Sequence, residues 1–325
     1  MTRNRAGIGR RGRCGLLIGA LALLAGAAPP PVRIFDPAVI PASSAGRELL
    51  VRVTAPVKLE GRLPVILFSH GAALSREQYA PIIDWWARHG FIVLQPDHED
   101  AVVDGFPPPV PPSADLWRTR IIDMERLGHA LDLIEAQVPE LRGHIDRTKI
   151  LAAGHSFGGH TVAALMGAKV WNERLKRYES FDDPQIRGAV LLSPPGDGGA
   201  ALSSEWQKRG SFLNMDWKTM HGPMLIIVGS ADTGKPMTVM GPAWHEDAYR
   251  ESVAHGICQI SLEGALHYLG GIVDPRRTGV EDADPHRLAA VRETSLALFR
   301  DALAGRAPST ADMAVKGTPA TVECR

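Results

Sequence analysis

The chain has 325 residues, 45% of them hydrophobic and 22% charged, which is enough to bury one large core and gives no reason to divide it into several domains. Its 36 Lys and Arg residues balance 36 Asp and Glu residues, which argues against a protein that binds nucleic acid or anionic lipid. We therefore expect a small-molecule partner and no nucleic acid. No pattern indicates a cofactor, and nothing in the sequence predicts the oligomeric state.

The N-terminus has the pattern of an export signal. Five arginines precede an apolar run at residues 16–28, which is too short to span a bilayer comfortably and carries small residues at Ala25 and Ala27. We therefore expect residues 1–28 to be a signal peptide and the mature chain to be secreted or periplasmic, with no membrane span. An uncleaved anchor is the alternative, and both the general and the twin-arginine export routes stay open.

Strands and helices alternate after the signal. In chain order, the expected elements are strands 48–56 and 63–69, helix 76–90, strand 91–97, helix 116–137, strand 149–154, helix 157–168, strands 186–193 and 223–229, helix 244–255, strand 256–262 and helix 286–304. The proline-rich residues 106–113 form a loop in this prediction, because proline lacks the N–H that helices and inner strands need. The alternation predicts an α/β protein with a mostly parallel central sheet and helices on both faces. Residues 29–305 form one domain, followed by a polar C-terminal tail at 306–325.

Ser156 lies in the segment GHSFGG, which fits a Gly-x-Ser-x-Gly pattern. The pattern directly follows a predicted strand and opens a predicted helix, an order that lifts a serine above the sheet on a sharp turn. The first helical N–H, on Phe157, and the positive end of the helix dipole then face any negative charge that forms beside the serine. We predict that Ser156 is a nucleophile. An ordinary glycine-rich turn is the alternative.

A second motif comes earlier in the chain, in the segment FSHGAALSREQYAPIIDWWARHGFIVLQPDH at residues 68–98. Together with GHSFGG, it resembles the platelet-activating-factor acetylhydrolase, chlorophyllase and dienelactone hydrolase-like group of α/β-hydrolases, over roughly residues 47–271. The resemblance implies the α/β-hydrolase fold, and it makes Ala72 the donor of an oxyanion N–H with Phe157 as its partner. His70 precedes the serine in sequence, so we expect it to shape the loop rather than to act as a base.

The acid and the base are predicted from chain order, which in these folds runs serine, acid, histidine. Asp232 follows the strand at 223–229, and His267 follows the last strand of the alternation. Asp197 stays open as the acid, because the eukaryotic acetylhydrolases of this group draw theirs from the end of the preceding strand. His245 and His255 fall in a predicted helix and are assigned to surface or packing.

These residues predict a secreted serine hydrolase that cleaves short to medium acyl esters through an acyl-enzyme. The alternatives are a lipid, phospholipid or polyester hydrolase of the same fold, a peptide hydrolase, and a non-catalytic ligand-binding protein. An aromatic-rich segment after residue 193 is long enough either to line an acyl pocket or to anchor a surface loop. Its candidate pocket residues are Trp206, Phe212, Met215 and Trp217.

Cys258 and Cys324 remain after removal of the signal, and in an oxidising compartment such a pair is either bridged or free. Two isolated cysteines are too few for a structural zinc site, and neither has another ligand at the usual spacing, so we expect no metal. The segment GSADTGK at 229–235 matches most of a phosphate-binding loop. Pro236 stands where Ser or Thr would bind magnesium, which argues against nucleotide binding.

Overall fold

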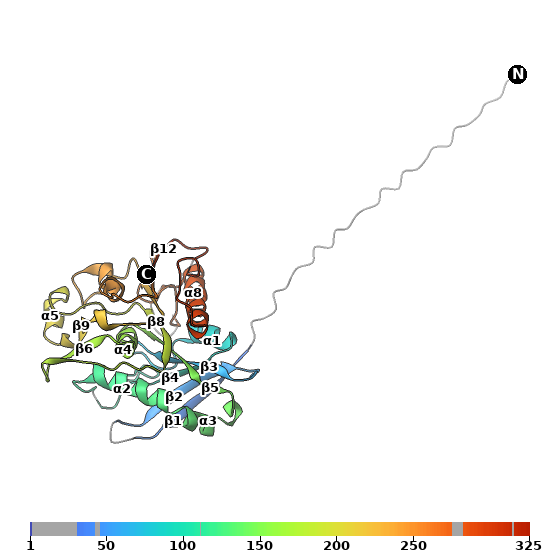
Figure 1. The fold of residues 1–325 in the computed structure, drawn as a ribbon, viewed down its shortest axis with the longest axis horizontal. Helices are drawn as coiled ribbons and strands as arrows, with labels where there is room; N and C mark the ends of the chain where they lie inside the picture. The colour runs from blue at the N-terminus through green and yellow to red at the C-terminus, as the bar shows by residue number, and fades with distance from the viewer. Residues whose placement is uncertain (2–30, 43–45, 111, 275–281, 314) are drawn as a thin grey trace.

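A nine-stranded sheet runs through the molecule (Figure 1). The computed structural model describes residues 1, 31–42, 46–110, 112–274, 282–313 and 315–325. Apart from Met1, the predicted signal peptide lies outside these residues. The strands of the sheet are β1 (Val32–Ile40), β2 (Leu49–Pro56), β3 (Leu63–Ser69), β4 (Ile92–Pro96), β5 (Ile145–His155), β8 (Ile186–Leu192), β10 (Met224–Gly229), β11 (Ile257–Leu262) and β12 (Ala320–Cys324).

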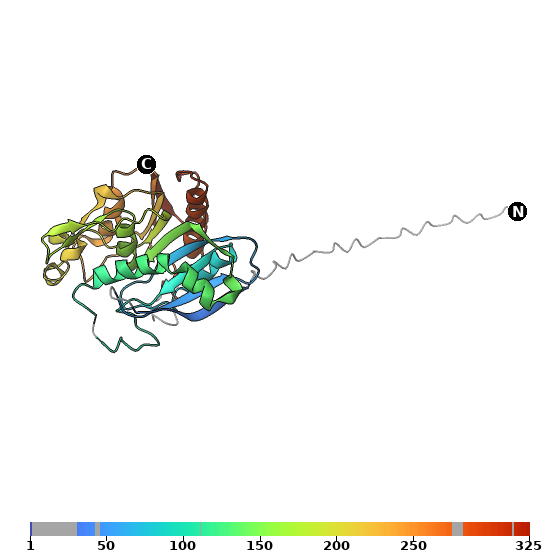
Figure 2. The same ribbon diagram turned by 60° about the horizontal axis from the view of Figure 1, so that its bottom comes forward.

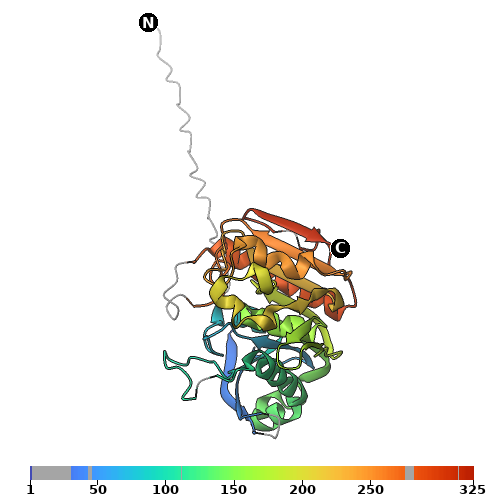
Figure 3. The same ribbon diagram turned by 90° about the vertical axis from the view of Figure 1, so that its left-hand side faces the viewer.

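The sheet is parallel through its centre and antiparallel at both edges. Its strand order is β1-β2-β4-β3-β5-β8-β10-β11-β12, and every neighbouring pair from β4 to β11 is parallel. β1, β2 and β12 pair antiparallel. Figure 3 shows the blue N-terminal strands in one half of the molecule and the orange and red C-terminal strands in the other. The carboxyl ends of the central strands therefore meet at one edge, where α/β proteins collect their functional residues.

Helices cover both faces of this sheet. They are α1 (Ala80–Arg88), α2 (Leu116–His129), α3 (Leu131–Gln137), α4 (Phe157–Leu165), α5 (Ser204–Gln207), α6 (Asp247–Arg250) and α8 (Pro285–Leu303). Side chains alternate along β3, so Val65 and Leu67 pack in a core with α2, α3 and α4, whereas Ile66 and Phe68 pack in a core with α1 and α8. Figure 2 shows α2 and α3 lying across the blue strands. The predicted α/β-hydrolase fold class is confirmed. Of the helices in the described ranges, none is long and apolar enough to cross a membrane.

Several elements differ from the sequence prediction. The single helix predicted at 116–137 is divided into α2 and α3. β1 was not predicted, because Pro37 interrupts its pattern; the proline falls at a register shift on the edge of the sheet, where a missing N–H is tolerated. The segment 306–325, predicted to be a polar tail, ends in β12, whose side chains alternate between half-buried and exposed because one face of the strand packs on the core. The helix predicted at 244–255 reduces to a 3-10 turn at Gly241–Glu246 and the short α6.

A small sheet follows α4, built from β6 (Lys169–Asn172), β7 (Arg177–Glu179) and β9 (Met215–Asp216) in the order β7-β6-β9. Both of its pairings are antiparallel. The pairing of β9 with β6 brings part of the aromatic-rich segment after residue 193 back against the domain.

A disulfide joins the last strand to the rest of the sheet. Cys324 of β12 lies directly opposite Cys258 of β11, with the two Cα atoms 4.1 Å apart, and the two side chains are bonded. The sequence separation is 66 residues, so the bond closes a long loop and lowers the conformational entropy of the unfolded chain. Of the two states that the sequence left open, the structure has the bridged one.

We expect Cys324→Ser to lower the free energy of unfolding by about 2–4 kcal/mol, because the unfolded chain regains the freedom of that loop. Urea unfolding of the variant and the unaltered protein measures the difference. The double variant Cys258→Ser/Cys324→Ser is the control, since it leaves no free thiol to exchange. An unchanged urea midpoint in both variants would show that the bond does not stabilise the fold.

Candidate active site

Ser156 lies on a sharp turn between β5 and α4. Its backbone has φ 54° and ψ −120°, a conformation that residues other than glycine rarely adopt. The glycines on either side have no room for a side chain. A Cβ on Gly154 would lie 2.1 Å from the carbonyl oxygen of Gly158, and a Cβ on Gly158 would lie 2.0 Å from the carbonyl oxygen of Ser69. The Gly-x-Ser-x-Gly pattern thus reflects a tight strand-to-helix turn that leaves Ser156 half-buried at its top.

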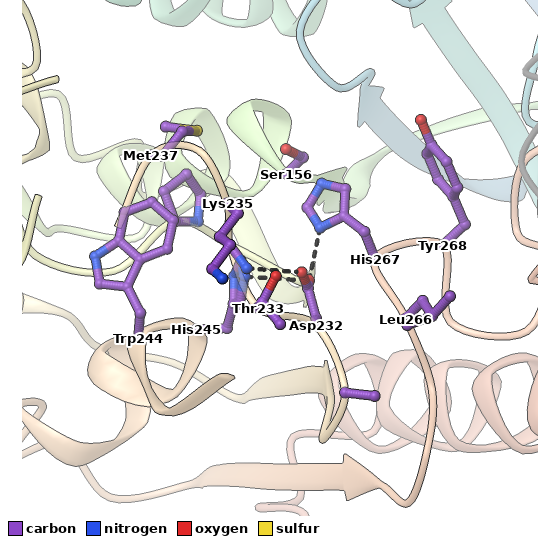
Figure 4. A pocket seen from close by; sticks show the side chains of 13 residues that line it. Ser156, Asp232, Thr233, Lys235, Met237, Trp244, His245, Leu266, His267 and Tyr268 are labelled. Carbon is purple, nitrogen blue, oxygen red and sulfur yellow. Dashed lines mark hydrogen bonds and ion pairs between the residues drawn. The ribbon is translucent and has the colours of Figure 1, made fainter. Parts of the chain in front are cut away.

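Asp232 and His267 meet at the same edge of the sheet. Asp232 follows β10, His267 follows β11, and His267 Nδ1 lies 2.7 Å from Asp232 Oδ2. Ser156, Asp232 and His267 all line one pocket, and Figure 4 shows the Ser156 side chain beside the His267 ring. A hydrogen bond from Nδ1–H to the carboxylate leaves Nε2 of the neutral ring as a proton acceptor. The structure therefore brings together the three residues that the sequence predicts for a triad.

The carboxyl group of Asp232 is held in its ionised form. Burial raises its pKa, but the adjoining imidazoles of His245 and His267 outweigh burial and hold the pKa well below its usual range. A carboxyl whose pKa is lower in the folded protein than in the unfolded chain stabilises the fold above about pH 4. That contribution disappears as the pH falls through the folded-state value.

We therefore expect Asp232→Asn to lower the free energy of unfolding at neutral pH, and to lower it progressively less below about pH 4, where the aspartate itself becomes protonated. Urea unfolding of both proteins over a series of pH values measures this difference. A stability deficit that grows on acidification would contradict the ionised carboxylate.

A second histidine contacts the same carboxylate. His245 is buried, its Nε2 lies 3.1 Å from Asp232 Oδ2, and its Nδ1 lies 2.7 Å from the carbonyl oxygen of Pro194 (Figure 4). The ring therefore bridges Asp232 to the segment after β8. From the sequence, His245 was predicted to be a surface or packing residue. The contact was missed because the spacing of the two residues along the chain carries no signal for it.

Two backbone N–H groups near the serine have no acceptor among the hydrogen bonds of the described residues, those of Ala72 and Phe157. Phe157 is the first residue of α4, where the N–H has no partner within the helix and the helix dipole is positive. Ala72 is exposed, and its neighbours are already bonded: Gly71 N–H donates to Tyr79 and Ala73 N–H donates to Asp100. Both amides predicted for the oxyanion hole are therefore available to a ligand.

His155 links the segments that carry these groups. Its Nδ1 lies 2.8 Å from the Tyr79 hydroxyl, which accepts the N–H of Gly71, and its Nε2 lies 3.0 Å from the carbonyl oxygen of His267. Burial lowers the pKa of His155 well below its usual range, so the ring is neutral. Nε2–H then donates to His267 and Nδ1 accepts from Tyr79. His155 therefore has a structural role, joining the segment before Ala72 to the segment that carries His267.

The pocket of Ser156 has a volume of about 360 Å³. Besides the three predicted triad residues and His245, it is lined by a group of large apolar side chains and by the exposed residues Thr233 and Lys235. The apolar group consists of Pro195, Met237, Trp244, Leu266 and Tyr268. A pocket of this size and lining suits a small, mostly apolar ligand.

The four residues predicted to line an acyl pocket lie elsewhere. Met215 and Trp217 are buried in the main core, and Trp206 packs against a small separate cluster. Phe212 packs on Phe157, with ring centroids 5.3 Å apart. Among the described residues, the lining of the serine pocket includes none of the four. This prediction is wrong, because the segment folds back on the domain and packs its large side chains there. Met215 and Trp217 are buried, and Trp206 and Phe212 are half-buried.

Asp197, the alternative acid, forms hydrogen bonds with two tryptophans rather than with a histidine. Its carboxylate accepts the indole N–H of Trp217, and its backbone carbonyl accepts the indole N–H of Trp244 at 2.8 Å. Burial raises the pKa of this carboxyl group. It is Asp232 that contacts His267, so the geometry favours Asp232.

Asp232, His245 and His267 also match a set of metal ligands. Each offers one ligand atom, and the three atoms lie within 4.8 Å of one another. Two imidazoles and a carboxylate suit a divalent ion such as zinc. A metal on His267 Nδ1 would replace the proton that bonds to Asp232, so the ion and the hydrogen bond exclude each other. The sequence carries no ligand spacing for this set, because its members come from separate segments.

The parallel sheet and the strand-end positions of Ser156, Asp232 and His267 define an α/β-hydrolase-fold protein. Comparison with known families narrows this class. A family model described as Chlorophyllase matches residues 38–176, which contain both the FSHG segment and GHSFGG but neither Asp232 nor His267.

The chain is also similar to curated proteins with two names. It is 29% identical over 175 residues to a platelet-activating factor acetylhydrolase of Cavia porcellus, covering 43% of this chain and 37% of the relative. It is 33% identical over 109 residues to Chlorophyllase type 0 of Chenopodium album, covering 33% and 30%. It is 31% identical over 125 residues to a chloroplastic Chlorophyllase-1 of Citrus unshiu, covering 38% and 34%. The matches span about a third of each relative, and they confirm the resemblance to the platelet-activating-factor acetylhydrolase and chlorophyllase group.

Proposed function

We propose that this protein is a secreted serine hydrolase of carboxylic esters, with Ser156 as nucleophile, His267 as base and Asp232 as acid. The 2.7 Å contact between His267 and Asp232, on the pocket that also contains Ser156 in its strained turn, carries the proposal. The names of the related proteins, an acetylhydrolase and chlorophyllases, support an ester substrate. The disulfide supports an oxidising compartment.

Catalysis begins when Ser156 Oγ attacks the ester carbonyl carbon and His267 Nε2 takes the hydroxyl proton. The carbonyl oxygen becomes an oxyanion that accepts hydrogen bonds from the N–H groups of Ala72 and Phe157. The intermediate collapses, and the alcohol leaves with the proton from His267, giving an acyl-enzyme. Water then loses a proton to the same histidine and attacks the acyl carbon. As the carboxylic acid leaves, His267 returns that proton to Ser156 Oγ, which regenerates the enzyme. Asp232 holds the ring in the required tautomer and stabilises its positive form.

The substrates that we propose are short to medium acyl esters. A mostly apolar pocket of about 360 Å³ is at the small end of the usual range for ligand sites, which supports a compact acyl group. A series of p-nitrophenyl esters from acetate to palmitate tests this, with the highest kcat/KM expected between acetate and octanoate. Rising kcat/KM up to palmitate, or activity on phospholipid vesicles or polyester films above that on the soluble esters, would favour the lipid or polyester alternative.

A fluorophosphonate probe tests the nucleophile. The mature protein is treated with the probe, and the modified peptide is located by mass spectrometry. We expect the label on Ser156, no label in Ser156→Ala, and strongly slowed labelling in His267→Ala. A folded protein that takes no label, or takes it on another serine, would contradict the triad and favour a non-catalytic ligand-binding protein of the same fold.

A further inference from the structure

Arg120 is fully buried where the two backbone segments of the proposed oxyanion hole come together. It lies on α2, and its side chain has no exposed area. A guanidinium group withdrawn from water is costly unless its donors are all engaged, so a buried arginine has to be held by several partners. The partners of Arg120 lie on both sides of the proposed hole.

The first group of partners comes immediately before Ala72. Arg120 Nη1 donates to the carbonyl oxygen of His70 at 2.7 Å, and Nη2 donates to the carbonyl oxygen of Gly71 at 3.2 Å. The carbonyl of Gly71 belongs to the same peptide group as the N–H of Ala72. The Gly71 carbonyl also accepts from His70 Nδ1–H at 2.7 Å and from Leu74 N–H at 3.2 Å. Arg120 is thus one of three donors that hold the plane of the peptide whose N–H is proposed to face the oxyanion.

The second contact comes immediately after Ala72. Asp100 forms a bidentate pair with Arg120, at 3.0 Å to Nε and 2.9 Å to Nη2, and also accepts the N–H of Ala73 at 3.1 Å. Burial raises the pKa of Asp100, but the charge of Arg120 outweighs burial and holds the pKa well below its usual range, so the pair is ionic. Arg120 thus bonds to the backbone just before Ala72, and its partner Asp100 bonds to the backbone just after it.

The third contact is with the other half of the hole. The Arg120 guanidinium carbon lies 4.7 Å from the centroid of the Phe157 ring. A guanidinium over an aromatic face is attracted to it, and the attraction is stronger away from water. Phe157 supplies the second proposed oxyanion N–H, so one side chain contacts both segments that carry the donors.

We propose that Arg120 is a positioning residue that holds the N–H groups of Ala72 and Phe157 at the separation that an oxyanion requires. The inference rests on the proposed function. Asp100 neutralises the guanidinium, so Arg120 acts through the geometry of the two segments rather than through its own charge. Lysine cannot replace it, because a single ammonium group lacks the planar fork that reaches two carbonyls and a carboxylate while stacking on a ring.

The test compares an ester with the matching thionoester, in which sulfur replaces the carbonyl oxygen. Sulfur accepts hydrogen bonds weakly, so the preference for the ester reports on the oxyanion hole. We expect Arg120→Met to lower kcat for the ester by about a hundredfold to a thousandfold, with a smaller loss for the thionoester and little change in KM. For Arg120→Lys, we expect a kcat for the ester between that of the unaltered protein and that of Arg120→Met. Arg118→Met is the matched control, since Arg118 is on the same helix with a partly exposed side chain, and it should keep the preference.

Circular dichroism and urea unfolding check that each variant folds. Where Arg120→Met does not fold, Asp100→Asn replaces it. The amide keeps one acceptor oxygen in place of two and carries no charge, so it weakens the pair with Arg120 and should reduce the same preference. A folded, active Arg120→Met enzyme that keeps the full preference for the ester overturns this inference alone. Unaltered protein that hydrolyses neither ester and takes no fluorophosphonate overturns the proposed function and this inference with it.

Discussion

Replacing Ser156 with alanine is expected to lower kcat for ester hydrolysis by about a millionfold, the loss found when the nucleophile of a serine triad is removed. The variant keeps the pocket and both oxyanion donors but has no atom to attack the carbonyl carbon. His267 and Asp232 cannot compensate, because they act only through the serine hydroxyl. KM should change little, since the hydroxyl contributes little to substrate binding. Steady-state kinetics with a p-nitrophenyl ester measure both constants.

Ser193 offers a matched control for this substitution. It directly follows the neighbouring strand β8, has a positive φ of 42°, and its buried hydroxyl has no hydrogen-bond partner among the described residues. Ser193→Ala therefore makes the same chemical change at an equivalent position and should keep kcat within a few-fold of the unaltered enzyme. An equal loss in Ser193→Ala and Ser156→Ala would point to a disturbed sheet edge rather than to a missing nucleophile.

The second large effect is expected from Asp232→Asn, which should lower kcat by about ten-thousandfold while leaving KM nearly unchanged. The carboxylate accepts the Nδ1–H of His267 at 2.7 Å and so keeps Nε2 available as the base. An amide can offer an N–H at that position, which favours the opposite tautomer and puts a proton on the nitrogen that has to accept one. Measuring kcat of the variant and of the unaltered enzyme from neutral to alkaline pH checks this loss.

Two variants separate this effect from general disturbance of the site. Asp197→Asn changes the rival acid and should keep activity within a few-fold, because Asp197 bonds to Trp217 rather than to a histidine. His245→Gln removes the second histidine on the Asp232 carboxylate and should cost far less than Asp232→Asn, since the bond to His267 remains. A larger loss in Asp197→Asn than in Asp232→Asn would reverse the assignment of the acid.

The sequence by itself determined the features that depend on residues adjacent in the chain. The turn at Ser156 is specified within GHSFGG, because the two glycines permit the close approaches of the strand, the helix and Ser69 that a side chain would block. Asp232 and His267 could also be predicted, although they come from distant segments. Parallel strands bring their carboxyl ends to one edge, so position after a strand is enough to place a residue there.

Tertiary structure alone decided which side chains surround these three. The contact of His245 with Asp232, the contacts of Arg120 with Gly71 and Phe157, and the membership of the pocket all join segments whose spacing along the chain follows no period. The error at Trp217 has the same origin: an aromatic residue in a long irregular segment fills either a pocket or a core, and only the path of the chain determines which. β12 escaped prediction because its alternating pattern, with Ala320, Val322 and Cys324 on the core side, is only five residues long and ends a polar segment.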